Sequence, residues 1–219
     1  MNDRYIKWGA LGAIAYPIIQ LISQGLIQFG GREPAFNAPA AEILRFFQNR
    51  NPAFTEIAGY LSALSAIAFL WFIGALWREL RKAEGEPGWI SFIAAGSGLV
   101  TAAAFNSGGW ELALFRVNEG LDPQVARLLF DEGNLNFATS WISNGSMLLA
   151  AGIVFRGAGI YPKWLGWGSI ILAVGLFLAR ALWTTQIAFL PYVLLWAWMI
   201  GFGIFVLRRS QVEASGSKA

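Results

Sequence analysis

Residues 121–155 read LDPQVARLLFDEGNLNFATSWISNGSMLLAAGIVF, which joins a helix start and a polar first half to an apolar second half. Asp122 is of a type that caps helices well and Pro123 suits the first helical position, so a helix is predicted to begin here. At about 1.5 Å per residue, a helix from Pro123 to Phe155 is about 50 Å long. A bilayer core is only about 30 Å thick, so the first turns are predicted to project beyond it.

The composition of the whole chain supports a membrane location for this helix. Of the 219 residues, 56% are hydrophobic and 13% are charged, and the mean hydropathy is +0.52, values outside the soluble range. The apolar runs are continuous and long, so they favour helices and lack the alternation of a β-barrel. The sequence therefore predicts an all-α fold, a polytopic membrane protein with a bundle of six transmembrane helices. The predicted spans are residues 8–29, 54–77, 89–115, 128–155, 164–183 and 187–207.

The segments outside the spans complete one transmembrane domain, predicted to cover residues 1–209. The first external loop, about residues 30–53, contains PAAEILRFFQNRNP, in which Ile43, Phe46 and Phe47 share one helical side with Leu44. This pattern predicts a short interfacial helix lying on the outer membrane surface. Residues 210–219 read SQVEASGSKA, a small and polar composition that predicts a disordered cytoplasmic tail.

The basic residues predict how the chain sits in the membrane. With the N-terminus in the cytoplasm, ten of the 16 Lys and Arg residues lie near inner ends of spans and six near outer ends. The positive-inside rule then places both termini in the cytoplasm, and we expect a multi-pass protein of the bacterial cytoplasmic (inner) membrane. The inner set is Arg4, Lys7, Arg78, Arg81, Lys82, Arg156, Lys163, Arg208, Arg209 and Lys218, and the outer set is Arg32, Arg45, Arg50, Arg116, Arg127 and Arg180.

The chain contains no histidine and no cysteine. This excludes Ser-His-Asp and Cys-His nucleophiles, tetrahedral zinc sites, His-ligated haem and Glu-x-x-His di-iron sites. Carboxylates and asparagine amides could hold a hard cation, but no spacing matches a metal-binding loop, so neither a metal nor a cofactor is predicted. The net charge of +3 requires no nucleic-acid partner.

Polar residues gather in the outer halves of the predicted spans, whereas the inner halves are nearly bare of them. Unpaired polar groups in hydrocarbon cost on the order of several kcal/mol, so these side chains should face one another or a wet cavity. The distribution predicts a polar pocket that opens outward above a closely packed apolar inner half. The candidate pocket residues are Gln20, Gln24, Glu56, Tyr60, Asn106, Trp110, Glu111, Glu132, Asn136, Ser140 and Arg180.

A stripe of small residues in the third span favours close helix packing below this pocket. Ala94, Gly98, Ala102 and Asn106 stand four apart, which lets a neighbouring backbone approach closely. Asn106 is expected where this seam opens into the pocket. The alternative interpretation is that the polar residues form only interhelix hydrogen bonds and ion pairs, with no ligand, because carboxylates at the membrane boundary are ordinary.

Three motifs are similar to those of a group of six-helix bacterial membrane proteins that is classed as a domain of unknown function. They are LRKAEGE at 80–86, LDPQVARLLFDEGN at 121–134 and YPKWLGW at 161–167, and the likeness covers about residues 55–207. The resemblance implies a six-helix integral membrane fold without an established activity. It supplies no catalytic residue, and a fold alone does not define a function.

The residues leave three functions open. The sequence favours a non-catalytic binding or accessory subunit, surrounded by membrane lipids and bound to a larger membrane complex or to copies of itself. Its basis is the lack of a catalytic constellation together with long, Trp-rich helices. The second hypothesis is a small-molecule or ion transporter that uses carboxylates of the outer half. The third is a carboxylate-based intramembrane enzyme.

Overall fold

The computed structural model describes residues 4–29, 31, 33–104 and 108–216. Every regular element in this part of the chain is a helix, which confirms the all-α prediction. Six helical segments are long and apolar enough to cross a membrane, and each overlaps one predicted span. These are Tyr5–Gln28, Ala53–Glu84, Trp89–Glu119, Pro123–Ala158, Lys163–Ala181 and Gln186–Val212.

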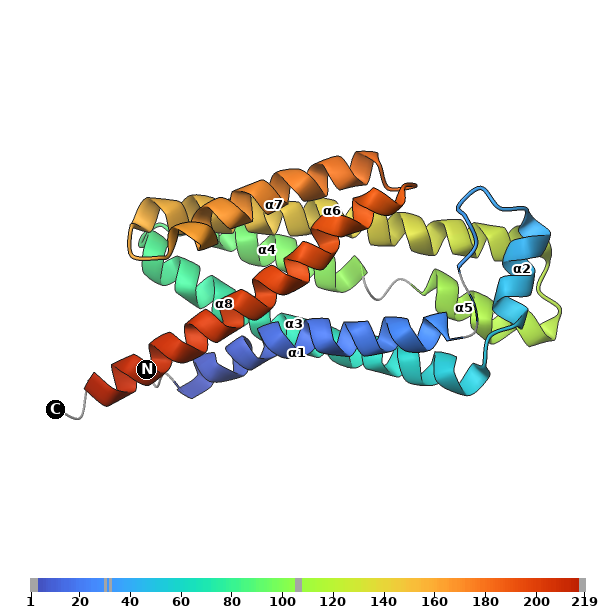
Figure 1. Ribbon diagram of the computed structural model, residues 1–219, viewed down its shortest axis with the longest axis horizontal. Coiled ribbons are helices and arrows are strands. Elements are labelled where there is room, and N and C mark those ends of the chain that lie inside the picture. The colour runs from blue at the N-terminus through green and yellow to red at the C-terminus, as the bar shows by residue number, and fades with distance from the viewer. Residues whose placement is uncertain (1–3, 30, 32, 105–107, 217–219) are drawn as a thin grey trace.

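The helices form an elongated bundle in which α1 begins and α8 ends at the same end, here called the terminal end (Figure 1). The opposite end, here called the cap end, holds α2, α5 and the start of α6. There α3 and α6 extend further than α7 (Figure 1). In chain order the elements are α1 (Arg4–Gln28), α2 (Ala40–Gln48), α3 (Pro52–Glu84), α4 (Trp89–Ala104), α5 (Gly109–Arg116), the 3-10 helix η1 (Val117–Glu119), α6 (Pro123–Ala158), α7 (Lys163–Ala181), the 3-10 helix η2 (Gln186–Ala188) and α8 (Phe189–Gly216).

Glycines allow α1 to pack closely on both α3 and α8. A Cβ atom at Gly12 would lie 2.4 Å from the carbonyl oxygen of Ala68 on α3. On another side of α1, a Cβ atom at Gly203 of α8 would lie 2.6 Å from the carbonyl oxygen of Ala10. Real Cβ atoms do not approach backbone oxygens so closely, so α1 can hold this position only where a side chain is missing.

The predicted small-residue stripe forms a buried seam along α4. Ala94, Gly98 and Ala102 are all buried. A Cβ atom at Gly98 would lie 2.2 Å from Cδ1 of Ile73 on α3 and 3.4 Å from the sulfur of Met147 on α6. The stripe is therefore buried against α3 and α6, and at Gly98 it is side chains rather than a neighbouring backbone that approach closely. Asn106, the fourth member of the stripe, lies outside the described residues.

The start of α6 also agrees with the sequence. The side chain of Asp122 accepts hydrogen bonds from the backbone N–H groups of Gln124 and Val125, at 2.8 and 3.3 Å, and Pro123 is the first helical residue. The helix is 36 residues long, or about 54 Å at about 1.5 Å per residue. At the other end of the chain, disorder is predicted from residue 210, whereas α8 continues to Gly216.

The cap is a small second core made by α2, α5, η1 and the first turns of α6. It confirms the predicted helix in the first loop and shows what covers the apolar side of that helix. Ile43, Phe46 and Phe47 of α2 are buried. They pack against α5, η1 and α6 rather than facing outward, because two other helices reach this end of the bundle. The buried cluster is Ala38, Ile43, Phe46, Phe47, Ala113, Val117, Ala126 and Phe130.

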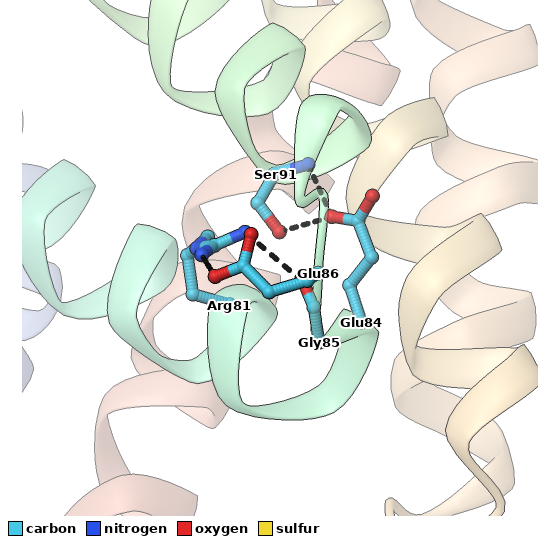
Figure 2. Close-up of polar contacts among 5 residues, drawn as sticks. All are labelled: Arg81, Glu84, Gly85, Glu86 and Ser91. Carbon is cyan, nitrogen blue, oxygen red and sulfur yellow. Dashed lines mark hydrogen bonds and ion pairs between the residues drawn. The ribbon is translucent and has the colours of Figure 1, made fainter.

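A compact turn joins α3 to α4 at the terminal end (Figure 2). The carboxylate of Glu84 accepts hydrogen bonds from the backbone N–H of Ser91, at 2.8 Å, and from its hydroxyl group. The guanidinium of Arg81 donates to the carbonyl oxygen of Gly85, at 3.0 Å, and to the carboxylate of Glu86. An acidic group at a helix start satisfies free N–H groups and is stabilised by the helix dipole. These contacts fix the angle between α3 and α4.

Glu79 links three parts of the chain at the same end. Its side chain is buried on α3, and the hydroxyl of Tyr161 donates to its carboxylate and to its carbonyl oxygen, both at 3.1 Å. Arg209 of α8 places Nη1 3.6 Å from the same carboxylate. Burial, and next the charge of Glu79, raise the pKa of Tyr161 to about 12, so the hydroxyl keeps its proton at physiological pH.

Candidate functional site

Gln20, the first candidate pocket residue, forms a hydrogen bond between α1 and α3. Its side chain is buried, and Nε2 donates to the hydroxyl oxygen of Ser65 at 2.8 Å. One turn later Ser23 donates to the carbonyl oxygen of Ala58, also at 2.8 Å. The next candidate on this helix, Gln24, is exposed. The two helices thus satisfy the polar groups that they bury, as membrane helices require.

Ser140 bonds within α6, next to a set of hydroxyl pairs that joins α4 to α6. It is buried and donates to the carbonyl oxygen of Phe137 at 2.6 Å. The hydroxyl groups of Thr101 and Ser143 lie 2.8 Å apart across the two helices. A further bond joins Ser97 to Ser146 at 2.9 Å. Hydroxyl pairs of this kind stabilise helix association by about 0.6 kcal/mol each on average.

The structure brings three candidate residues together where α5 meets α6: Trp110, Glu132 and Asn136. The amide of Asn136 donates to Oε1 of Glu132. The indole of Trp110 stacks on Phe130, with 5.4 Å between ring centroids, and its Nε1 is 3.4 Å from the carbonyl oxygen of Phe130. Gly109 allows α5 to approach α6 closely, since a Cβ atom at Gly109 would meet Oε2 of Glu132.

The remaining candidates lie apart from this cluster. Glu56, Tyr60 and Glu111 are exposed. The carboxylate of Glu111 lies beside α3, where Oε1 would be 3.1 Å from a Cβ atom placed at Gly59. Arg180 is half-buried on α7, with its guanidinium 5.9 Å from the centroid of the Trp183 ring. Asn106 lies outside the described residues, so its place in a pocket stays a prediction.

A buried arginine at the cap end, Arg50, is not among the predicted pocket residues. Arg50 is only 8% exposed and donates to the carbonyl oxygens of Ile27 and Gly31, the latter at 2.9 Å. Its guanidinium also lies 3.9 Å from the centroid of the Phe46 ring. Arg50 therefore satisfies carbonyl groups at the end of α1 that the helix itself leaves free. In the sequence it counted only as one of the outer basic residues.

Glu33 lies next to Arg50 and is hydrogen-bonded to Asn134 of α6. Burial raises the pKa of Glu33 from its ordinary value of 4.5 to about 6, and the charge of Arg50 and the bond from Asn134 oppose part of this shift. Asn134 belongs to the polar first half of this helix but is not among the predicted pocket residues. Nothing in the spacing of Glu33 or Arg50 pairs them with it, because the loops before and after α2 determine their positions.

Several buried polar atoms on α6 have no hydrogen-bond partner among the described residues. They include one carboxylate oxygen each of Asp131 and Glu132, Nε1 of Trp141 and both amide atoms of Asn144. Asp131 also places its other oxygen 3.7 Å from Nε of Arg127. The described part of the chain holds no group of three or more acidic, histidine or cysteine side chains that could bind a metal ion. The unpartnered carboxylate oxygens of Asp131 and Glu132 can accept hydrogen bonds.

The fold and these side chains define a polytopic α-helical membrane protein with a polar cluster at its cap end. No family model, no curated protein and no solved structure matches the chain. The resemblance to six-helix proteins of unknown function therefore stays an interpretation of the motifs. Residues of two of these motifs form the terminal end of the bundle, namely Arg81 and Glu84 of LRKAEGE and Tyr161 of YPKWLGW.

Proposed function

We propose that this protein is a non-catalytic accessory protein of the membrane that binds a partner through its cap. The observation that carries the proposal is the exposure of large apolar side chains on α5 and the first turns of α6. Phe115 is 71% exposed and Leu128 is 67% exposed, and Leu112 and Val125 are exposed as well. Apolar surface that a bilayer does not cover is typical of protein-binding sites, and Val125 and Leu128 lie in the first turns of α6.

The length of α6 supports a position for these side chains beyond the hydrocarbon. The helix is about 54 Å long, and its last turns run along α7 in the bundle (Figure 1). A core about 30 Å thick leaves roughly 16 residues of α6 outside, so its first turns contact headgroups or water unless a partner covers them.

The polar pocket predicted from the sequence fits the same proposal, with Glu132 as its central residue. One oxygen of Glu132 accepts from Asn136, and the other is buried without a donor among the described residues. A buried acceptor without a partner costs about 1–3 kcal/mol, which a donor group on a bound partner would recover. We therefore expect Glu132 to receive an N–H or O–H group once partner binding exposes its free oxygen.

Site-specific photo-crosslinking in cells that produce the protein tests this proposal. A photoreactive residue replaces Leu128 in the cap or Ile171 on α7, which are 67% and 68% exposed and so equally accessible. We expect a discrete crosslinked protein from position 128 and only lipid adducts from position 171. The Glu132→Gln substitution should reduce the product at 128 without changing the amount of folded protein. The same product pattern at both positions, or none at 128, contradicts the proposal.

Transport of a small molecule or an ion is the second candidate, favoured by the buried free oxygen of Glu132. Ionisable side chains inside a membrane bundle often mark an ion pathway. In proteoliposomes that contain a pH-sensitive dye, a transporter of this kind moves protons under an imposed gradient, and Glu132→Gln stops the movement. Glu111→Gln is the matched control, because Glu111 is exposed. If the dye shows no proton movement in proteoliposomes that contain the wild-type protein, proton transport is rejected.

We further propose that the protein lies in the bacterial cytoplasmic membrane with both termini in the cytoplasm. The basic residues support this orientation, because Arg78, Lys82 and Arg208 all lie at the terminal end. In the same region, Glu79, Glu84 and Glu86 are already engaged by neighbouring groups.

A further inference from the structure

A surface groove lies between the start of α7 and the last turns of α8, at the terminal end of the bundle. Its volume is about 340 Å³. It is far from the cap, so it has no part in the function proposed above. The groove is lined by Trp164, Gly201, Ile204, Phe205, Arg208, Arg209 and Val212.

The groove has an apolar wall along most of its length. Gly201 forms part of this wall, and a Cβ atom there would lie 3.3 Å from Cη2 of Trp164. The indole of Trp164 thus lies close over the backbone of α8. Ile204 and Phe205 continue the wall toward the end of the helix. Trp side chains often lie at the boundary between hydrocarbon and headgroups, and Trp164 lies at the start of a candidate span, Lys163–Ala181.

Two arginines follow the apolar wall by one helical turn, at positions 208 and 209. Arg209 is engaged, because it lies 3.6 Å from the carboxylate of Glu79 and its guanidinium is 5.3 Å from the ring centroid of Tyr161. Arg208 is exposed and makes no ion pair within the described part of the chain. One cation of the groove is therefore available to an anionic group from outside.

We propose that this groove binds one anionic phospholipid, with an acyl chain against Trp164 and Phe205 and the phosphate at Arg208. The charge complementarity is direct, since the groove combines an apolar wall with an unpaired guanidinium near the end of the last membrane-spanning segment. A zwitterionic lipid fits the apolar wall equally well, but its ammonium group cancels much of the attraction to Arg208. The groove is therefore selective for the charge of the headgroup rather than for the acyl chain.

Native mass spectrometry of the full chain in a mild detergent measures this selectivity. The protein is titrated with phosphatidylglycerol or with phosphatidylcholine of identical acyl chains. We expect one phosphatidylglycerol to be retained in preference to phosphatidylcholine. In Arg208→Gln its affinity should fall about five-fold, the effect expected for one arginine near an anionic surface. The Lys7→Gln control removes an exposed cation of α1 outside the groove and should leave the affinity unchanged.

Further results distinguish a specific site from general attraction to a basic surface. Arg208→Lys keeps the charge and should retain most of the preference for phosphatidylglycerol. Equal retention of both lipids by the wild-type protein overturns the proposal. So does an equal loss of affinity in Arg208→Gln and Lys7→Gln, which indicates that only the net charge matters. Arg208 is exposed, so its substitution should not affect folding.

Discussion

Single residues at the cap end show how the protein buries charged side chains there. Arg50 is buried and satisfies carbonyl oxygens of Ile27 and Gly31, while its charge partly offsets that of Glu33. Desolvation is the larger effect on Glu33, because the pKa of its carboxyl group is raised despite the arginine beside it. The cap therefore becomes more stable when Glu33 is protonated.

The stability of the cap should fall as pH rises from about 4.5 to about 6. Glu33 has a pKa of about 6 in the folded cap and an ordinary value of 4.5, so its protonated form favours the folded state. The contribution is complete below the lower value and is lost above the higher one, with a difference of at most about 2 kcal/mol. Hydrogen exchange of α2 amides, corrected for the intrinsic effect of pH, measures it as faster opening at pH 7 than at pH 4.5.

Glu33→Gln should abolish this pH dependence, because the glutamine is uncharged throughout. Glu42→Gln is the control, since Glu42 is an exposed acid in α2 itself and its removal should leave the dependence in place. Unchanged behaviour of Glu33→Gln would show that another group controls the opening of the cap.

At the scale of elements, helix α1 depends on glycine far more than its composition indicates. Its apolar residues are spread over all faces of the helix, so they predict a membrane span but not which face packs against a neighbour. The structure shows that one side meets α3 at Gly12 and that another meets Gly203 of α8. Gly25, near the end of the helix, has no atom within 4 Å of an added Cβ. The glycines of α1 therefore differ in their roles, and sequence alone does not separate them.

Substitution of two glycines in α1 tests this difference. In Gly12→Ala the new methyl group would lie 2.4 Å from the carbonyl oxygen of Ala68, so α1 and α3 must separate. We expect a loss of about 1–3 kcal/mol in the free energy of unfolding. Gly25→Ala meets nothing and should be neutral or stabilising by up to about 1 kcal/mol, through higher helix propensity. Reversible denaturation in mixed micelles compares the two variants, and equal stability would contradict the close packing of α1 on α3.

At the scale of the whole molecule, the bundle has two ends of different chemistry. The terminal end carries exposed cations, a clamp around Glu79 and the groove at Trp164. The cap end carries its own hydrophobic cluster and the partly buried acids of α6. Six spans place the two ends on opposite sides of a membrane, and this separation is what the proposed functions of the two ends require.

Cysteine labelling determines which end faces the cytoplasm. The chain contains no cysteine, so a single introduced cysteine is the only cysteine in the protein that the label can modify. Asn118→Cys lies at the cap end and Ile160→Cys at the terminal end, and both positions are exposed. We expect a membrane-impermeant maleimide to label Cys at 118 in intact cells and Cys at 160 only after permeabilisation. The reverse pattern would place the cap in the cytoplasm and reject the proposed orientation.

Much of the architecture was predictable because long apolar runs and helix caps are local signals. The six spans, the start of α6 at Asp122 and the seam along α4 follow from residues close together in the chain. The candidate site was less predictable, because a polar residue can face a pocket, another helix or the surface. Gln20 and Gln24 are only one turn apart, yet the first is buried against α3 and the second is exposed.

The sequence by itself determined that this chain forms six membrane-spanning helices, because the cost of unpaired backbone groups in hydrocarbon permits little else for such apolar runs. Only the tertiary structure decided which side chains meet. Helix α2 packs on α5 and α6, Glu33 lies beside Arg50, and Trp164 lies over Gly201 of α8. These contacts join residues far apart in the chain. They depend on how each helix is rotated about its axis and how closely two helices approach, and hydropathy contains no information on either.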